Sequence, residues 1–493
     1  MAEDKEILEE LFEIMTERER QGVRSISDQI LSLKSDIDSL RNTKIMVAYG
    51  GGKDSTYTVA FMRAVQLYIK QIQGCSFILR VANMRHAGVP FAVMQNIHRV
   101  YKKLGLLDND EAELLVIDND RISPFALDLP MPQDMVEINR IDVLMNGHRT
   151  KGDGRPTFCN SCNLSVANFY GLACWHNGGV DFLVTGDSKK EQKHYFTWIM
   201  RMGQKIGLDV DDKRAQGFKG VLSVLNKVGE EYYKSLYGDN DRVALDQRFV
   251  SPGGEAEAPN FLSIYSAVDY RVDEHWKMVV DYLGFEFDEL AFSFTESDCF
   301  NPALMAHIRG LKVQYEQGRT YLEGIEEYLG LAEKLMHKKE IPENLINIAM
   351  AKYATPEKCM QMYDKVSTYM AEVFGLTNDH LIAMIISPFV DRGARLSKYM
   401  ALLPQEKQLP VGELHSLLKG EGQSKLNRTS QALEELVGLP INMLQKLYLS
   451  NTVEFSDENS LIAFVRKNDP HKHIIQTFDP DTGRPTSELV SGR

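Results

Sequence analysis

The stretch from Lys44 to Ser55 decides the fold and reads KIMVAYGGGKDS. It begins as a short apolar strand, and the residues from Thr56 to about Lys70 have the spacing of a helix. Between them stand Gly50, Gly51 and Gly52, and consecutive glycines let backbone N–H groups converge without obstruction by Cβ atoms. The N-terminus of the following helix adds partial positive charge. The sequence therefore predicts an anion-binding loop between a strand and a helix.

The three residues after the glycines carry side chains suited to a nucleotide and its metal ion. Lys53 can neutralise a phosphate, Asp54 can hold Mg²⁺ directly or through water, and Ser55 can donate a hydrogen bond to a phosphate oxygen. The motif is not the Walker loop, which requires G-x-x-x-x-G-K-[ST]. A tight turn without a ligand is the alternative, but the position after a strand and the Lys-Asp-Ser sequence favour phosphate binding.

Further apolar segments alternate with helical ones along the chain. We expect strands at Ser76–Met84, Glu113–Asp118 and Val180–Thr185, and a helix near Phe91–Leu104. Such alternation indicates a parallel sheet built from right-handed crossovers. The predicted fold class is α/β, with a parallel, doubly wound, Rossmann-like sheet.

Three regions are predicted. Residues 1–42 form an N-terminal helical segment of two helices, which suits docking or a homodimer contact. Residues 43–290 form the α/β domain, with a Gly-rich and charged insertion or lid at about 203–259. Residues 291–493 form a large α-helical C-terminal domain, in which no strand is evident before Ile474 and Ile475.

Composition excludes several classes of protein. Of 493 residues, 43% are hydrophobic and 25% charged, which is typical of a globular protein of two to four domains. No apolar run approaches the ~18–20 residues of a membrane helix, and the acidic N-terminus is unlike a signal peptide. Six cysteines are too few for a disulfide framework, so we expect a reducing, cytoplasmic location. The net charge of −13 disfavours a dedicated nucleic-acid binder.

At the glycine-rich loop the sequence resembles the PP-loop ATP pyrophosphatases, the adenine-nucleotide alpha-hydrolase-like superfamily of HUP-type folds. Their signature is S-G-G-x-D-S, and Gly50 replaces its first serine. The resemblance implies that ATP is split to AMP and pyrophosphate by adenylation of a carbonyl-type oxygen, after which a nucleophile displaces AMP. It also implies that the end of the second strand, from Ala82 to Met84, lines the adenine pocket through backbone groups. Arg85 and His86 follow this strand. They are either surface loop residues or polar residues near the nucleotide.

The stretch from Thr185 to Glu191 looks like the second nucleotide motif of this family. The resemblance implies that Gly186 ends a strand beside the nucleotide and that Asp187 shares Mg²⁺. Lys189 or Lys190 would stabilise the departing pyrophosphate. A solvated helix start is the alternative for this run of charges, but a place at the carboxyl edge of a parallel strand favours function.

Cys159 and Cys162 form a C-x-x-C motif. By itself the motif fits half of a metal site, a redox pair or chance, and no second C-x-x-C exists to complete a four-cysteine zinc site. One PP-loop branch, the iron–sulfur tRNA 2-thiolation enzymes, carries a C-x-x-C and a later third cysteine. That resemblance implies that Cys159, Cys162 and Cys299 hold a [4Fe–4S] cluster with one open iron for a sulfur species. A structural zinc or a catalytic dithiol remains the alternative.

Three functions follow as hypotheses. The first is an ATP-dependent sulfurtransferase that yields a thioamide or thiocarbonyl. The second is an amidotransferase or amide synthetase that uses ammonia or an amine, since the region from Asn96 to Leu106 and the C-x-x-C also resemble sugar amidotransferases. The third is a non-catalytic nucleotide-binding regulator.

The expected partners follow from the charge pattern. Between Thr185 and Lys227, nine Lys and Arg stand against five Asp and Glu, a local charge of +4. Such a patch suits tRNA, a sugar nucleotide, a carrier protein or ATP itself. The C-terminal region lacks an RNA-binding motif, so we favour a small-molecule or carrier-bound substrate over tRNA. A partner protein would supply the sulfur or the ammonia.

Overall fold

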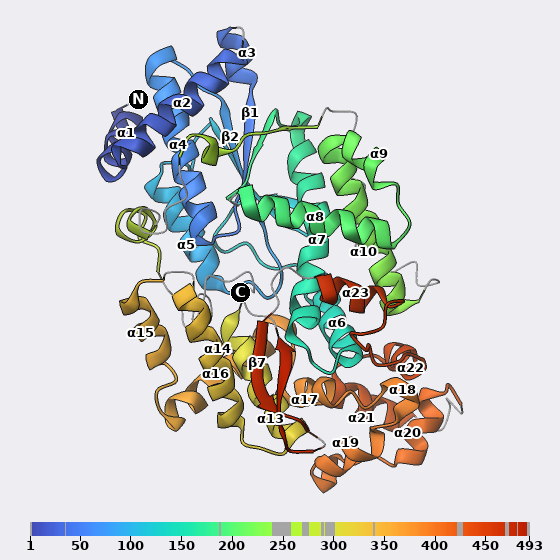
Figure 1. The fold of residues 1–493 in the computed structure, drawn as a ribbon. Coiled ribbons are helices and arrows are strands. Elements are labelled where there is room, and N and C mark those ends of the chain that lie inside the picture. The colour runs from blue at the N-terminus through green and yellow to red at the C-terminus, as the bar shows by residue number, and fades with distance from the viewer. Residues whose placement is uncertain are drawn as a thin grey trace. The chain divides into compact units, whose positions relative to one another are not determined.

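The computed structural model describes most of the chain (Figure 1). The described residues are 2–34, 36–186, 189–238, 258–268, 276–286, 290, 301–338, 341–421, 427–468, 473–480 and 482–490. The chain forms two compact units, each built from three segments. Unit 1 comprises Met1–Pro130, Ser165–Lys227 and Arg248–Asp288, and unit 2 comprises Met131–Leu164, Val228–Gln247 and Glu289–Arg493.

Unit 1 contains one six-stranded sheet in the order β4-β3-β2-β1-β5-β6. The strands are β1 (Lys44–Ala48), β2 (Ile78–Met84), β3 (Ala112–Asp118), β4 (Arg121–Pro124), β5 (Phe182–Val184) and β6 (Asn260–Phe261). All neighbours are parallel except β3 and β4. The predicted α/β class with a mostly parallel sheet is therefore confirmed. The antiparallel β4 and the two-residue β6 were not predicted.

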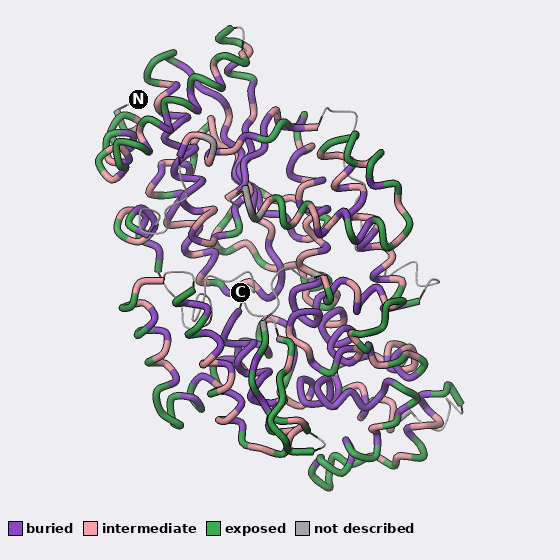
Figure 2. The backbone as a smooth tube through the Cα atoms, in the orientation of Figure 1, coloured by how far each residue is buried: buried purple, intermediate pink, exposed green. Residues whose placement is uncertain are grey.

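The sheet is buried on both faces, as Figure 2 shows for its central strands. On one face, Met46, Ala82 and Leu183 pack against Phe169 and Ala173 of α7. Because successive strand residues point to opposite faces, the alternate residues of β1 and β2 face the other way, and they are also buried. Near-continuous apolar strands are what a doubly covered parallel sheet requires.

The N-terminal residues form three helices where two were predicted. They are α1 (Ala2–Ile14), α2 (Glu17–Ser32) and α3 (Ile37–Asn42). The first two pack against α4 (Lys53–Gln73), so the predicted apolar stripes cover the α/β unit itself. The remaining segments that lie wholly or partly in unit 1 are α5 (Phe91–Lys103), α7 (Asn160–Trp175), η2 (His176–Gly178), α8 (Lys189–Lys205), α9 (Val210–Ala215), α10 (Gly217–Tyr237), η3 (Ile264–Ser266) and η4 (Lys277–Tyr282).

Unit 2 is largely helical in its described part, and it ends in a hairpin that includes the expected strand at residues 474–475. Its elements are α6 (Gln133–Arg149), η1 (Arg155–Cys159), α13 (Pro302–Gln317), α14 (Tyr321–Lys338), α15 (Glu343–Ala351), α16 (Pro356–Phe374), α17 (Asn378–Ile386), α18 (Val390–Gly393), α19 (Leu396–Leu402), η5 (Gln405–Lys407), α20 (Val411–Leu418), α21 (Asn427–Val437), α22 (Ile441–Leu449), α23 (Leu461–Asn468), β7 (His473–Phe478) and β8 (Pro485–Val490).

The two units do not correspond to the predicted domains, which were divided at residue 290. Residues 131–164 were expected inside the α/β domain, but they belong to unit 2 because α6 packs against α16, α17 and α22. Val143, Leu144 and Met145 of α6 are fully buried. The described part of the predicted insertion is helical, forming α9 and α10, and residues 239–257 lie outside the described residues.

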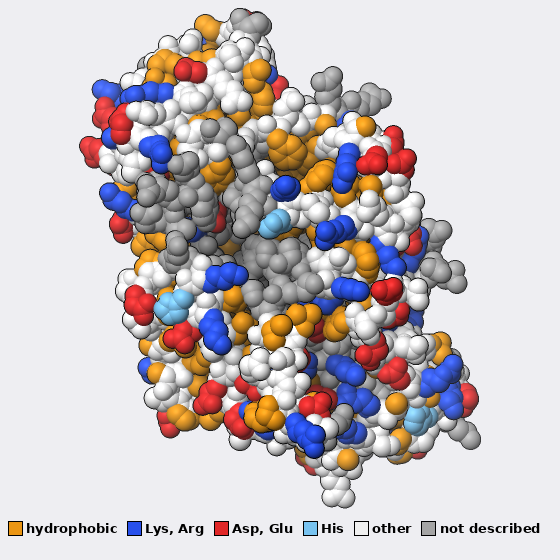
Figure 3. Space-filling view, viewed as in Figure 1, with side chains coloured by type: hydrophobic (Ala, Val, Ile, Leu, Met, Phe, Trp, Pro, Cys, Tyr) orange, Lys and Arg blue, Asp and Glu red, His pale blue; other side chains and the backbone are white. Residues whose placement is uncertain are grey.

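None of the helices seen in the described ranges is both long enough and apolar enough to cross a membrane. The surface over α8, α9 and α10 carries Lys and Arg side chains interspersed with Asp and Glu (Figure 3). Arg214 pairs with Asp211 at 3.3 Å. Acidic groups therefore partly balance the basic patch predicted for this region.

Candidate functional site

The glycine-rich loop joins β1 to α4 at the carboxyl edge of the sheet in unit 1. Strand order reverses here, because β2 lies on one side of β1 and β5 on the other. In open α/β sheets, ligands bind outside the carboxyl ends of the strands at such a switch point. The predicted strand–loop–helix arrangement is therefore present, and it lies at the edge where a ligand is expected.

Gly51 is required by the shape of the loop. Its φ is +76°, and a Cβ at this position would stand 2.6 Å from Val93 Cγ1 and 3.2 Å from Ile97 Cδ1. A side chain would therefore meet both backbone strain and the face of α5. This contact sets the path of the loop over the N-terminal half of α5.

Gly50 and Gly52 have open space where a side chain would stand, with no heavy atom of another described residue within 4 Å. Gly52 is the N-cap of α4 and, as a glycine, has no side chain with which to cap the helix. The first N–H groups of a helix have no partners within the helix. The N-terminus of this 21-residue helix beside open space therefore suits an anion.

Gly186 brings the end of β5 against the first turn of α4. A Cβ on Gly186 would lie 2.8 Å from Ser55 N, 2.9 Å from Ser55 Cα and 3.0 Å from the Asp54 carbonyl carbon. The structure therefore joins the two sequence motifs, which are 130 residues apart, at one place. Tyr265 Oη also donates to the Gly186 carbonyl at 3.4 Å, a contact that the sequence did not indicate.

Lys53 and Asp54 lie side by side at the start of α4. Lys53 Nζ is 3.4 Å from Asp54 Oδ1, and only 3% of the Lys53 side chain is exposed. The ammonium also lies 5.1 Å from the ring centre of Trp276, within range of a cation–π interaction. Ser55 Oγ donates to the Gly52 carbonyl at 3.1 Å. The charged pair and the hydroxyl predicted from the sequence thus stand together.

A network of buried polar side chains supports the two ends of the glycine-rich loop. Asn83 Nδ2 donates to the Tyr49 carbonyl at 2.6 Å, and Tyr101 Oη donates to Asn83 Oδ1 at 2.7 Å. The Tyr49 hydroxyl is 3.0 Å from Thr56 Oγ1 in the first turn of α4. Sequence reasoning missed these positioning residues, because tyrosine and asparagine at strand ends carry no distinctive pattern.

The residues expected near an adenine lie at the end of β2. Ala82 is buried and its carbonyl accepts the Tyr49 N–H at 2.9 Å, so this carbonyl takes part in the pairing between the ends of β1 and β2. Met84 is partly exposed at the strand end. Its place at the carboxyl edge matches the prediction, and its contact with adenine stays a prediction.

Arg85 has a structural role. Its guanidinium donates to both Asp118 carboxylate oxygens, at 2.8 and 2.6 Å, and to the carbonyls of Leu129 and Pro130. It thus ties β2 to β3 and to the segment that follows β4. His86 is buried, which lowers the pKa of its imidazole to about 4. Its Nδ1 accepts the Gly88 N–H at 3.3 Å.

Four predicted site groups are not described. Asp187, the side chains of Lys189 and Lys190, and Cys299 all lie outside the described residues. The pairing of Asp187 with Mg²⁺, the role of Lys189 and the third cysteine ligand therefore stay predictions.

Cys159 and Cys162 lie in unit 2, where the π-helix η1 runs into α7. Neither cysteine forms a disulfide within the described part of the chain, Cys159 is buried and Cys162 is partly exposed. Burial of its thiol and, second, the nearby Cys159 raise the pKa of Cys162 to about 12, and the charge of Arg155 opposes this rise. π-Helical turns inside α-helices occur often at functional sites.

The cysteine turn partly fits a soft metal centre. The two neighbouring thiols are soft donors, and the charge of Arg155 favours the thiolate form of Cys162 that a metal requires. Thr157 Oγ1 is fully buried and has no hydrogen-bond partner within the described part of the chain. Among the described residues, no group of three or more His, Cys, Asp and Glu could hold a metal ion. The turn therefore supplies two donors, and the predicted third lies outside the described residues.

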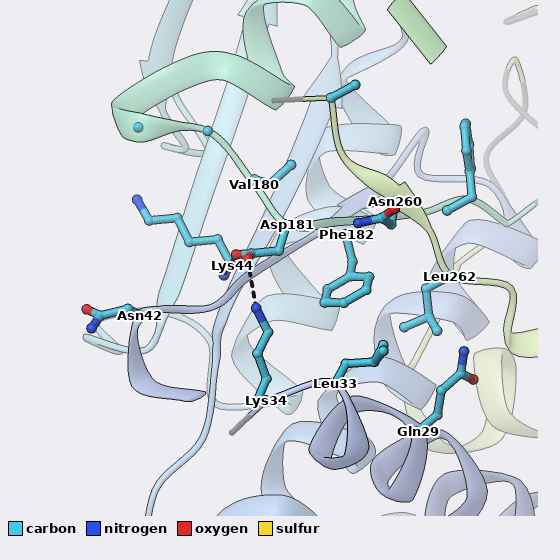
Figure 4. A pocket seen from close by; sticks show the side chains of 14 residues that line it. Gln29, Leu33, Lys34, Asn42, Lys44, Val180, Asp181, Phe182, Asn260 and Leu262 are labelled. Atoms are coloured by element: carbon cyan, nitrogen blue, oxygen red, sulfur yellow. Dashed lines mark hydrogen bonds and ion pairs between the residues drawn. The ribbon is translucent and has the colours of Figure 1, made fainter. Parts of the chain in front are cut away.

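A separate pocket of about 600 Å³ lies at the opposite, amino-terminal edge of the same sheet (Figure 4). Lys34 Nζ contacts Asp181 Oδ1 there at 2.8 Å, and the Lys44 N–H donates to the other oxygen of this carboxylate at 2.9 Å. Lys44 Nζ pairs with Glu113 at 2.8 Å. No residue predicted for nucleotide binding lines this pocket.

Comparison of the chain with protein-family models, with curated proteins and with solved structures found no match in any of the three.

Proposed function

We propose that this chain is a PP-loop ATP pyrophosphatase that adenylates a carbonyl or amide oxygen of its substrate, after which a sulfur nucleophile displaces AMP. The observation that carries the ATP step is the meeting of Gly186 with the backbone of Asp54 and Ser55 at the switch point of the sheet. It supports one site built from both nucleotide motifs. The open faces of Gly50 and Gly52 leave room for phosphates beside the first turn of α4.

The residues of the loop have distinct roles in the proposed reaction. The substrate oxygen attacks the α-phosphorus of ATP, a new O–P bond forms, and the bond to the bridging oxygen of pyrophosphate breaks. Lys53 and the N–H groups of α4 stabilise the charge that develops on the pyrophosphate. Asp54 would hold Mg²⁺, which supplies further charge stabilisation. Adenylation is needed because an amide oxygen is a poor leaving group, whereas AMP is a good one.

Sulfur is the proposed nucleophile because of the cysteine pair. Cys159 and Cys162 would hold the cluster, with Cys299 as the third ligand. Such a cluster supplies an open iron for a sulfur species. Attack by hydrosulfide on the activated carbon forms a C–S bond, breaks the C–O bond and releases AMP.

The first test measures pyrophosphate and AMP release from Mg-ATP by wild-type protein and K53A with candidate amide substrates. Removal of the ammonium at the loop should lower pyrophosphate release by about 10² to 10³-fold. The matched control is K70A, since Lys70 lies on the same helix but pairs with Asp4 and Glu111. Equal activity of K53A and wild type would refute the proposed site.

A second measurement identifies the nucleophile. Protein purified without oxygen should contain iron and acid-labile sulfide, and C159S and C162S should lose both. ATP-dependent product formation with ammonia in protein free of iron would instead establish the amidotransferase. ATP binding without any pyrophosphate release would establish the non-catalytic regulator.

A further inference from the structure

The segment before the cysteine turn is tightly fixed in unit 2. Gly152 has φ +65°, and a Cβ there would lie 2.8 Å from Ile385 Cγ1. A Cβ on Gly154 would lie 2.7 Å from Met305 Sδ. Asp153 lies between these two glycines. Their close contacts therefore restrict the backbone conformation of Asp153 just before η1 begins.

Asp153 organises the beginning of η1. Its Oδ1 accepts the Arg155 N–H at 3.1 Å, and its backbone carbonyl accepts the Thr157 N–H at 3.1 Å. These contacts fix the backbone of the residues that lead directly to Cys159. The Arg155 side chain acts electrostatically on Cys162, so its placement bears on this thiol.

The other oxygen of Asp153 is bound by a residue far along the chain. Arg466 Nε donates to Asp153 Oδ2 at 3.0 Å, across 313 positions of sequence. The Arg466 side chain is 1% exposed and that of Asp153 is 11% exposed. Removing one partner of a buried ion pair leaves the other charge uncompensated in a poorly solvated place.

Arg466 also joins the turn to the C-terminal hairpin. Its Nη2 donates to the Leu489 carbonyl of β8 at 3.3 Å. The neighbouring Glu488 is bound by Arg309 at 2.6 Å and by Lys312, both on α13. A cavity of only about 50 Å³ remains where the hairpin, α13 and the Gly152–Gly154 segment meet. The hairpin, α23 and the cysteine turn are thus closely packed parts of unit 2.

We propose that Arg466 is a positioning residue for the cysteine centre, and that α23 and the C-terminal hairpin hold the Cys159–Cys162 turn through the Arg466–Asp153 pair. This inference rests on the proposed function for the role of the two thiols in sulfur transfer. The contact itself is independent of ATP chemistry.

The test measures the alkylation rate of each cysteine in the full-length, reduced protein, using N-ethylmaleimide and peptide-resolved mass spectrometry. R466A should raise the rate at Cys162 about tenfold, because the turn is released and its buried thiol becomes accessible. R466K keeps the positive charge and should stay within about threefold of wild type. The buried Cys359 of unit 2 serves as the internal control and should not change.

The matched control is R395A, which breaks another charged pair in unit 2, that of Arg395 with Glu316 at 2.5 Å. It should leave the Cys162 rate unchanged. D153N retains an acceptor for the Arg155 N–H but loses the charge, so it tests the same pair if R466A does not fold. The double variant R466A/D153N should be no faster than the faster single variant.

An unchanged Cys162 rate in both R466A and D153N would overturn the proposal. A parallel rise at Cys162 and Cys359 would also overturn it, because it would show general loosening of unit 2. These outcomes are distinct from failure of the proposed function, since alkylation needs no ATP and K53A reports only on the ATP site.

Discussion

Four glycines around the proposed phosphate site fall into two groups by the space around their Cα atoms. Gly51 and Gly186 have neighbours within 3 Å of where a Cβ would stand. Gly50 and Gly52 have none within 4 Å. The sequence of the glycine triplet does not reveal this difference. Substitution by alanine should nevertheless have a different effect in each group, on stability in the crowded one and on ligand binding in the open one.

We predict that G51A destabilises the protein, whereas G52A mainly weakens ATP binding. The left-handed conformation of Gly51 makes a Cβ cost about 1–2 kcal/mol before its clash with Val93 is added. At Gly52 the new methyl group enters the open space proposed for phosphates, while φ of −83° suits alanine. Denaturant unfolding and equilibrium ATP binding measure the two effects. The reverse pattern, with G51A stable and G52A unfolded, would contradict this account of the loop.

The C-terminal hairpin shows how charge fixes one element on others. In β8, Glu488 accepts from Arg309 and Lys312 of α13. Burial alone would raise the pKa of Glu488, but the two cations outweigh it and lower that pKa to about 2. Arg309 also donates to Glu327 of α14 at 2.9 Å, so the hairpin completes a network that joins two helices.

We predict that E488Q lowers the free energy of unfolding at pH 7 by about 3 kcal/mol, from the shift between pKa 4.5 and 2. Because the folded-state pKa is lowered, this stabilisation is fully present above pH 4.5 and is lost as the pH falls toward 2. The difference between wild type and E488Q should therefore shrink over that window. Denaturant unfolding at several pH values measures it, with the exposed Glu372 of α16 as control in E372Q, which should match wild type. A difference that grows with acidification would refute the assignment.

At the scale of the whole molecule, the chain passes between the two units several times, so neither unit is one continuous segment. Helices α7 and α10 each include residues of both units. Within segment 131–164, α6 packs against α16, α17 and α22, which all come after residue 289. A predicted boundary at residue 290 therefore cuts through unit 2.

We predict that a fragment of residues 1–290 does not form a stable, monodisperse protein. It would expose the part of α6 that packs against α16, α17 and α22 in the full chain, where Val143, Leu144 and Met145 of this helix are all fully buried. An exposed apolar face of this size favours aggregation. Size-exclusion chromatography and binding of a hydrophobic dye measure the outcome against the full-length chain. A monodisperse fragment with little dye binding would show that the units are more independent than their packing indicates.

The sequence by itself determined the features that depend on neighbouring residues. The strand–glycine–helix loop, the parallel strands and the helical C-terminal region all follow from local periodicity and from the freedom of glycine. The candidate groups Lys53, Asp54 and Ser55 were found in the same way. Their spacing along the chain fixes their spacing in the loop, so no distant contact was needed to predict it.

Only the tertiary structure decided which distant residues meet. It placed Gly186 so close to the first turn of α4 that a Cβ would lie 2.8 Å from Ser55 N, it placed Arg466 Nε 3.0 Å from Asp153 Oδ2, and it assigned α6 to unit 2. It also made Arg85 a structural residue through its pair with Asp118. The physical reason is that such contacts depend on how the chain returns after hundreds of residues. A single aspartate, arginine or glycine carries no local pattern that encodes its partner.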